Sequence, residues 1–424
     1  MSSSSEIHVI DPASADSAHA QIAPVPRVSL QAFCETSDVS SIIQEAIADR
    51  RMQKAHVKLH MGGAVAAVEA YRESPTPNVI VIETTLDRAA LLDHLDALSE
   101  FCDSGTKVVV IGRMNDIALY RDLMARGVSE YLIAPFGVVD FVRAVSELYS
   151  AAGAPPLGRV ISFFGAKGGV GASTIAHNVA WSISRDFDIA TIVADMDLGF
   201  GTAGLDFNQD PPQGIADAVY APERLDANLI DRLLSKCTDK LSILAAPATL
   251  DRMYDFDESA FDMLLDVLRA SVPVVVLDIP HTWSAWSRRL LVSSDEVVIV
   301  AAPDLANFRN SKNILDTLRA ARPNDAKPKL ALNLVGMPKR PEIPVNDFSD
   351  QLELPASAIV GFDPKLFGTA ANNGQMIGEV EAGNKIVPVI DDLARAIMGR
   401  AEIKKQKRAI LNPIFDKFMR KKAS

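Results

Sequence analysis

Apolar residues in the first third of the chain form short runs that alternate with longer, amphipathic stretches. Val79–Ile82 and Lys107–Ile111 are almost wholly apolar, as expected for strands of a parallel sheet that is covered on both faces. The other predicted strands are Val28–Cys34, Val57–Leu59 and Tyr131–Ile133. Helices are predicted at residues 39–50, 64–71, 86–101, 116–126 and 138–151. This alternation of strands and helices predicts a doubly wound α/β domain.

The same pattern resumes at Arg159–Phe164 and continues to about residue 400. Further buried strands are predicted at residues 190–194, 274–277, 297–301 and 330–334. They predict a second doubly wound α/β domain with a mostly parallel sheet. We therefore divide the chain into a disordered leader (1–26), a first domain of flavodoxin-like size (27–150), a linker with Pro155 and Pro156 (151–158), a second domain (159–400) and a tail (401–424).

Composition and charge exclude several classes of protein. The 424 residues are 48% apolar and 23% charged, which is typical of globular domains. The net charge of −11 argues against a broad nucleic-acid-binding surface. Cys34, Cys102 and Cys237 are too far apart for a metal motif or a disulfide framework, so a reducing cytosol fits best. We expect neither a signal peptide nor a membrane-spanning helix.

The most informative motif begins at the end of the strand Arg159–Phe164. It is the glycine-rich segment Gly165–Thr174, and a helix is predicted from Ser173 to Ser184. A strand, a glycine-rich turn and a helix N-terminus form an anion cradle, because backbone N–H groups and the helix dipole face the ligand. The predicted nucleotide contacts in this loop are Gly165, Ala166, Lys167, Gly168, Gly169, Val170, Gly171, Ala172, Ser173 and Thr174.

The segment resembles the deviant Walker A motif of the ParA/MinD family of P-loop ATPases. The resemblance rests on Lys167, the three glycines and Ser173, and it implies that ATP and Mg²⁺ bind here. It also implies that Lys167 reaches across a homodimer to the second nucleotide, as a catalytic residue. One residue departs from the pattern, because Ala172 stands where the family has the P-loop lysine. Loss of that cation weakens phosphate binding and transition-state stabilisation, so hydrolysis is expected to be slow or absent.

Two strand ends supply carboxylates in the order that the family uses. The strand at 190–194 ends in Asp195-Met-Asp197, and Asp278 follows the strand at 274–277. The resemblance implies that Asp197 lies near the attacking water, and that Asp195, Asp278 and Ser173 hold Mg²⁺, partly through water. A single aspartate at a strand end is more often a turn or helix cap. The ordered set of three elements favours the nucleotide site.

Residues on the adenine side are predicted from the same resemblance. Asn333 matches an asparagine at the adenine edge, although it fits a satisfied core residue equally well. The stretch 359–364 resembles the family's loop after the last strand, which places Phe362, Asp363 and Pro364 against the base. The segment 367–374 is then expected to open the closing helix. His177 and His281 have no metal-ligand spacing and are interpreted as ordinary residues, and Trp283 and Trp286 suit either an interface or the core.

The end of the first domain, residues 125–136, resembles the last loop and strand of response-regulator receiver domains. The chemistry of that family is missing here. Glu83 stands in place of the phosphoacceptor aspartate, Ala134 in place of the lysine, and Gly112 in place of the Ser/Thr. We therefore interpret the domain as a docking or dimerisation module rather than a phosphorylation switch.

The tail is basic. From Arg400 it carries nine lysines and arginines against Glu402 and Asp416, with apolar residues at helical spacing. Such a helix can lie on an anionic membrane or pack on protein, and both interpretations stay open.

The pairing of a receiver-like domain with an altered P-loop domain resembles the CpaE/TadZ family of the tight-adherence (Flp-type) pilus system. This implies an ATP-binding, dimerising factor that positions pilus secretion components, at the cytoplasmic face of the inner membrane and often at a pole. Three alternatives stay open: a DNA-partition ATPase, a division-site regulator and a nucleotide-free scaffold. Nucleic acid is not an expected partner.

Overall fold

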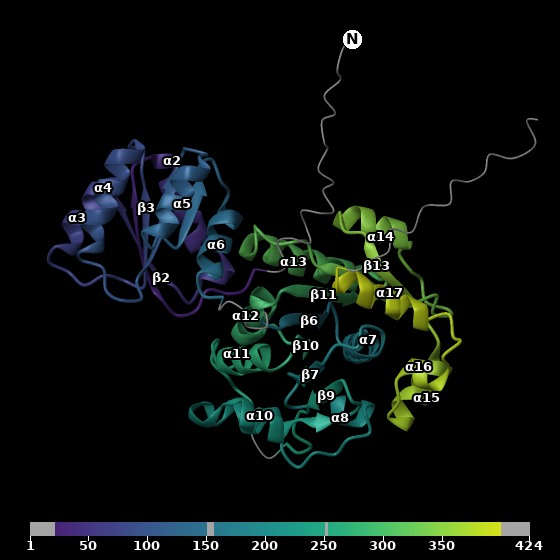
Figure 1. Ribbon diagram of the computed structural model, residues 1–424. Coiled ribbons are helices and arrows are strands. Elements are labelled where there is room, and N and C mark those ends of the chain that lie inside the picture. Colours follow the sequence, from purple (N-terminus) through teal and green to yellow (C-terminus); the bar gives the residue numbers. More distant parts are fainter. Residues whose placement is uncertain (1–21, 151–156, 251–252, 400–424) are drawn as a thin grey trace, which may run out of the picture.

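The computed structural model describes residues 22–150, 157–250 and 253–399, which form two α/β domains (Figure 1). The tail at 401–424 and most of the predicted leader and linker lie outside the described residues. Residues 22–25 were included in the predicted leader, yet Val25 is fully buried against the first domain. Its N–H donates to the Arg51 carbonyl oxygen at 2.8 Å. No helix in the described ranges is long and apolar enough to span a bilayer.

The first domain is a five-stranded parallel sheet in the order β2-β1-β3-β4-β5. The predicted doubly wound fold is confirmed, since separate apolar cores lie on the two faces of the sheet. The strands are β1 Ser29–Cys34, β2 His56–Met61, β3 Val79–Glu83, β4 Lys107–Gly112 and β5 Glu130–Ile133. The helices are α2 Ser37–Ile47, α3 Gly63–Tyr71, α4 Arg88–Ser99, α5 Ile117–Ala125 and α6 Val138–Glu147.

Several predicted helices in this domain are shorter than expected: α4 and α6 end at Ser99 and Glu147, and α2 is followed by a turn that matters for the domain contact. The prediction extended α2 to Arg50, but the helix ends at Ile47 and a 3-10 turn, η1 (Arg50–Met52), follows. The Asp49 side chain caps this turn by accepting from the Arg51 N–H at 2.9 Å. The turn faces the second domain, and its arginines are buried.

The second domain is an eight-stranded sheet in the order β13-β12-β11-β6-β10-β7-β9-β8. All pairs are parallel except β8 with β9, which confirms a mostly parallel sheet. Its strands are β6 Arg159–Gly165, β7 Thr191–Asp195, β8 Ser235–Lys236, β9 Leu241–Leu244, β10 Val274–Ile279, β11 Glu296–Ala301, β12 Lys329–Val335 and β13 Ala356–Gly361. The central strands β10 and β11 are buried from end to end, and β6 is buried except at its first residue, Arg159, because helices cover both faces.

Helices of unequal length connect these strands (Figure 1). They are α7 Ala172–Asp186, α8 Ala203–Asp206, α9 Ile215–Val219, η2 Pro222–Arg224, α10 Ala227–Leu233, α11 Asp262–Ser271, α12 Ala285–Ser293, α13 Leu305–Ala321, α14 Val345–Leu352, α15 Pro364–Asn373, α16 Ile377–Val380 and α17 Val387–Ile397.

Two expectations for the end of this domain are wrong. The stretch 359–364 was predicted as a loop after the last strand, but residues 359–361 belong to the last strand, β13. The segment 367–374 was expected to open the closing helix, but most of it forms the end of α15 and the closing helix is α17. The edge strand β13 alternates between buried and exposed residues, so it lacks the continuous apolar run that marks the central strands.

Candidate functional site

The glycine-rich segment lies at the carboxyl end of β6, the central strand, and leads into the N-terminus of α7. Gly169 and Gly171 have φ angles of +77° and +82°, in the left-handed region that favours glycine. Gly171 is the N-cap of α7, so Ala172, Ser173 and Thr174 form its first turn. The loop therefore presents a helix N-terminus at the ligand-binding edge of the sheet, which is the geometry predicted for an anion cradle.

Neighbouring elements fix the first residues of this loop. The Ala166 N–H donates to the Val300 carbonyl oxygen of β11 at 2.8 Å. The Asn310 side chain of α13 donates to the Ala166 carbonyl oxygen at 2.9 Å. A ring nitrogen of His281 lies 2.7 Å from the Gly165 carbonyl oxygen. The segment after β10 and the helix after β11 both contact the loop directly.

Asn333 contacts the loop from β12. Its amide nitrogen donates to the Val170 carbonyl oxygen at 2.8 Å, and the side chain is buried. A Cβ atom on Gly171 would lie 2.6 Å from the same nitrogen, so a glycine is required there. The amide oxygen of Asn333 is buried and accepts no hydrogen bond within the described chain. Asn333 thus supports the phosphate loop and keeps one unsatisfied acceptor that a ligand amino group would satisfy.

The carboxylates of Asp195 and Asp278 lie side by side, because β7 and β10 pair in register at these residues. Both side chains are buried. Burial, together with the charge of Asp278, raises the pKa of Asp195 to about 7. Two buried carboxylates carry like charges that repel each other, so a cation between them is stabilising. Carboxylate oxygens are the ligands that Mg²⁺ prefers.

Asp195 also shapes the turn that follows β7. Its carboxylate accepts hydrogen bonds from the N–H groups of Asp197 at 3.1 Å and Ala203 at 3.0 Å. Gly201 packs against that carboxylate so closely that a Cβ atom would collide with it. Asp197 is partly exposed, and its carboxylate accepts from the Phe200 N–H at 3.0 Å. The predicted metal-site residue therefore holds the turn that carries the predicted catalytic aspartate.

His177, interpreted from the sequence as an ordinary residue, lies beneath these carboxylates. It is fully buried on α7, one turn after Ser173. Its Nδ1 atom is 2.7 Å from an Asp206 carboxylate oxygen, and its Nε2 atom is 3.4 Å from Asp278. Burial lowers the pKa of His177, but the hydrogen bonds and charges of Asp206 and Asp278 raise it to about 10. The helical spacing from Ser173 was the signal in the sequence that could have identified it.

The remaining predicted residues surround the loop. Lys167 is exposed at the loop, near Asp304. Burial alone would raise the pKa of Asp304, but hydrogen bonds from Asn307 and the charge of Lys167 lower it. Trp283 is half exposed, with its ring edge-on to Phe164 at 6.0 Å between centroids, whereas Trp286 packs on the core. The sequence left both interpretations of these tryptophans open; the core interpretation fits Trp286, and the interface interpretation of Trp283 stays a prediction.

Phe362, Asp363 and Pro364 lie where β13 ends and α15 begins. The Phe362 N–H donates to the Val335 carbonyl oxygen at 2.8 Å. Asp363 caps α15 by accepting from the Leu366 N–H at 3.0 Å, and Pro364 is the first residue of that helix. These contacts place the three residues beyond the end of β12, the strand that carries Asn333.

The residues present fit a nucleotide with Mg²⁺. The loop provides a helix N-terminus whose first turn carries the Ser173 hydroxyl, and Asp195 and Asp278 provide carboxylate oxygens at adjacent strand ends. In the described ranges no group of three or more histidine, cysteine or acidic side chains could hold a metal by itself. Ala172 provides no cation to the phosphates.

In the first domain, Glu83 is the last residue of β3, at the carboxyl end of the parallel sheet. This buried carboxylate accepts hydrogen bonds from the N–H groups of Glu35 at 2.7 Å and Thr36 at 2.9 Å. It also accepts from the Thr36 hydroxyl at 2.6 Å. Glu35 in turn accepts from the Thr85 N–H at 2.7 Å. The Glu83 carboxylate, which stands where the resemblance to receiver domains expects the phosphoacceptor aspartate, is thus held by hydrogen bonds from within the domain.

The second domain is similar in fold to solved ATPases of the ParA/MinD type. No model of a protein family matches the sequence. A solved ParA family ATPase from Chlorobium tepidum is 24% identical, covers 56% of this chain and 98% of its own, and has a TM-score of 0.51. MinD from Pyrococcus horikoshii, solved with Mg-ADP, is 18% identical over 57% of this chain and 96% of its own, with a TM-score of 0.51. The fold and the site define a P-loop domain of the ParA/MinD type.

The sequence is also similar to a septum site-determining protein MinD of Synechocystis, at 25% identity over 58% of this chain and 91% of that relative. A solved pilus assembly protein CpaE from Caulobacter crescentus is 48% identical over 30% of this chain and 97% of its own, with a TM-score of 0.30. The chain belongs to the CpaE family of pilus assembly proteins, within the ParA/MinD superfamily.

Proposed function

We propose that the chain is an ATP-binding, dimerising assembly factor for a tight-adherence pilus, with weak or absent hydrolysis. The observation that carries nucleotide binding is the phosphate loop on the central strand β6, with Asp278 and Asp195 at the ends of the next two strands. This arrangement brings the anion cradle and the oxygen donors for Mg²⁺ to one edge of the sheet. The identity to the Caulobacter pilus protein supports the pilus role.

Each residue of the site would have a separate role in binding nucleotide and Mg²⁺. The loop amides and the helix dipole of α7 would bind the phosphates, and Asn333 would hold the loop in shape. Ser173 and Asp278 would hold Mg²⁺, which neutralises phosphate charge when bound. Asp195 would fix the turn that carries Asp197. The exposed Lys167 would contact a nucleotide across a homodimer, so binding would control association even with little turnover.

The test is calorimetry of ATP with Mg²⁺, alongside light scattering, on wild type and Lys167→Ala. The proposal predicts that ATP binds the wild type and drives a dimer that Lys167→Ala does not form. Lys365→Ala is a matched control, because Lys365 is exposed on α15. Absence of both binding and association in the wild type would leave the nucleotide-free scaffold as the function.

The cellular part of the proposal needs its own test. A strain that lacks the gene should lose surface pili, and Lys167→Ala should not restore them although Lys365→Ala does. We also propose that the basic tail holds the protein at the cytoplasmic face of the inner membrane. Sedimentation with anionic vesicles should then require residues 401–424, and binding that survives their removal would refute that role.

A further inference from the structure

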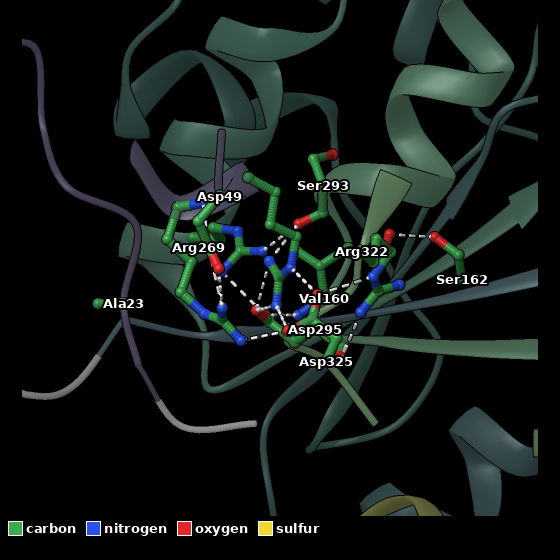
Figure 2. Close-up of polar contacts among 12 residues, drawn as sticks. Ala23, Asp49, Val160, Ser162, Arg269, Ser293, Asp295, Arg322 and Asp325 are labelled. Carbon is green, nitrogen blue, oxygen red and sulfur yellow. Dashed lines mark hydrogen bonds and ion pairs between the residues drawn. The ribbon is translucent and has the colours of Figure 1, made fainter. Parts of the chain in front are cut away.

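The two domains meet around a buried cluster of charged side chains (Figure 2). The first domain contributes Asp49, Arg50 and Arg51 from the turn η1 and its cap. The second domain contributes Arg269, Asp295, Arg322 and Asp325. Each of these side chains is at most 7% exposed. Burial on this scale means that the contacts are part of the fold rather than a loose surface pairing.

Arg50 joins the two domains within this cluster. Its Nε atom donates to Asp325 at 2.6 Å, and its Nη1 atom donates to the Ser293 carbonyl oxygen at 3.0 Å. Asp295 lies 3.5 Å from the same guanidinium. Ser293 is the last residue of α12, so Arg50, together with Arg269 at 3.3 Å, satisfies a carbonyl group that a helix end leaves without an intrahelical partner.

The cluster also holds the ends of two other elements. Asp295 accepts from the Val160 N–H of β6 at 2.9 Å, and its N–H donates to the Val160 carbonyl oxygen at 2.8 Å. Arg322, at the end of α13, donates to Asp325 at 2.8 Å and to the Leu291 carbonyl oxygen of α12 at 3.1 Å. The start of β6 and the ends of α12 and α13 therefore share one set of charges with Arg50.

The opposite ends of these three elements meet the phosphate loop. β6 runs into the loop at Gly165. The segment before α12 includes His281, whose ring nitrogen contacts the Gly165 carbonyl oxygen. Near the start of α13, Asn310 donates to the Ala166 carbonyl oxygen. A shift of the first domain at the cluster would thus reach the loop through a packed strand and two helices.

We propose that docking of the first domain through Arg50 holds the phosphate loop in its binding conformation, so the receiver-like domain acts as a built-in positive regulator of the nucleotide site. The inference rests on the proposed nucleotide binding. Coupling of this kind is reciprocal, so nucleotide on the loop also tightens the domain contact. A partner that binds to the first domain would therefore change the affinity of the second domain for nucleotide.

The test compares full-length wild type with Arg50→Gln by hydrogen–deuterium exchange and by calorimetry of ATP with Mg²⁺. Arg50→Gln keeps a polar side chain but loses the contacts to Asp325 and Ser293. We expect faster exchange at residues 281–293 and 165–171, and a Kd for ATP at least fivefold higher. Lys54→Gln is the matched control, since Lys54 pairs with Asp266 of the second domain at 2.5 Å but at the exposed rim.

Unchanged exchange at 281–293 and 165–171 in Arg50→Gln, or equal changes in Lys54→Gln, would overturn the proposal. Wild type that binds no ATP would refute the proposed function, while exchange of the nucleotide-free proteins would still decide the coupling. If Arg50→Gln does not fold, Arg50→Lys takes its place, because lysine keeps the charge without the forked donors. Its exchange at the same residues is read in the same way.

Discussion

The side-chain amide of Asn333 donates a hydrogen bond to the carbonyl oxygen of Val170, 2.8 Å away. This contact joins β12 to the middle of the phosphate loop, across the intervening strand β11. The resemblance to ParA/MinD proteins assigned Asn333 to the adenine edge. The structure shows that its amide nitrogen is already used to shape the loop, while its oxygen faces no donor within the described chain.

Removal of this contact should weaken both the fold and the site. In Asn333→Ala the buried Val170 carbonyl group loses its donor, at a cost of about 1–3 kcal/mol in the free energy of unfolding. ATP affinity should fall as well, because the loop loses its support. Chemical denaturation and calorimetry measure the two effects. Asn373→Ala, at an exposed residue of α15, should change neither; an equal loss in both variants would contradict this explanation.

The missing P-loop lysine should be restorable. Ala172 is the first residue of α7 and is partly exposed, so a longer side chain can extend from the helix N-terminus. We expect Ala172→Lys to bind ATP roughly tenfold more tightly or better, and to hydrolyse it faster, since a cation then contacts the phosphates. Calorimetry and phosphate release measure both effects. Ala172→Gln, which lacks the charge, should stay near wild type, and a gain there would argue for shape rather than charge.

The turn after β7 offers a matched pair of glycines. A Cβ atom on Gly201 would collide with the Asp195 carboxylate, whereas a Cβ atom on Gly199 would lie 3.9 Å from the nearest atom, an oxygen of Asp197. Gly201→Ala should cost about 1–3 kcal/mol in the free energy of unfolding, because the carboxylate must shift. Gly199→Ala should cost much less. Equal losses in denaturation experiments would show that the packing at Asp195 is not the cause.

Acid should weaken the contact between the domains. Burial would raise the pKa of Asp325, but the charges of Arg50, Arg322 and Arg51 lower it from 3.8 to about 2. A lowered pKa stabilises the fold fully above pH 3.8, and this contribution, about 2 kcal/mol, is lost as the pH falls through 2. Asp325→Asn should therefore show a flatter fall in stability between pH 4 and 2. Asp239→Asn, at an exposed aspartate, should follow the wild type.

The first domain should depend on Glu83 for stability and should resist phosphorylation. Glu83→Ala leaves the N–H groups of Glu35 and Thr36 without their acceptor, which should cost about 2–4 kcal/mol. Glu69→Ala, at an exposed residue of α3, should cost little. Acetyl phosphate should leave the mass of the wild-type protein unchanged. A phosphorylated wild type would contradict our interpretation of the domain as a docking module.

Sequence patterns predicted the fold well where burial is continuous. Val79–Ile82 and Lys107–Ile111 were recognised because a strand covered on both faces has few polar residues. The two-residue strand β8 and the edge strand β13 carry no such run, and both were missed. The four-residue strand β9 was missed as well, although it is largely buried. The phosphate loop was predicted because its glycines are close in sequence and each spacing has a physical reason.

Contacts between distant segments left no such pattern. Arg50 and Asp325 are 275 residues apart, and neither has a local neighbour that marks it as buried. His177 was interpreted as ordinary because Asp206 and Asp278 approach it only in the folded sheet. Arginine and aspartate are usually exposed, so their burial at the domain contact follows from the tertiary structure alone.

The presence of Glu83 bears on how the first domain can be regulated. In a receiver domain, a reversible covalent group supplies negative charge at this edge and a kinase sets the timing. Here the carboxyl group at this edge belongs to the polypeptide itself and accepts hydrogen bonds from the N–H groups of Glu35 and Thr36. If the first domain is a docking module, as we interpret it, every copy of the chain presents the same surface to its neighbours. Under the proposed function, changes over time would then come from nucleotide and from binding partners.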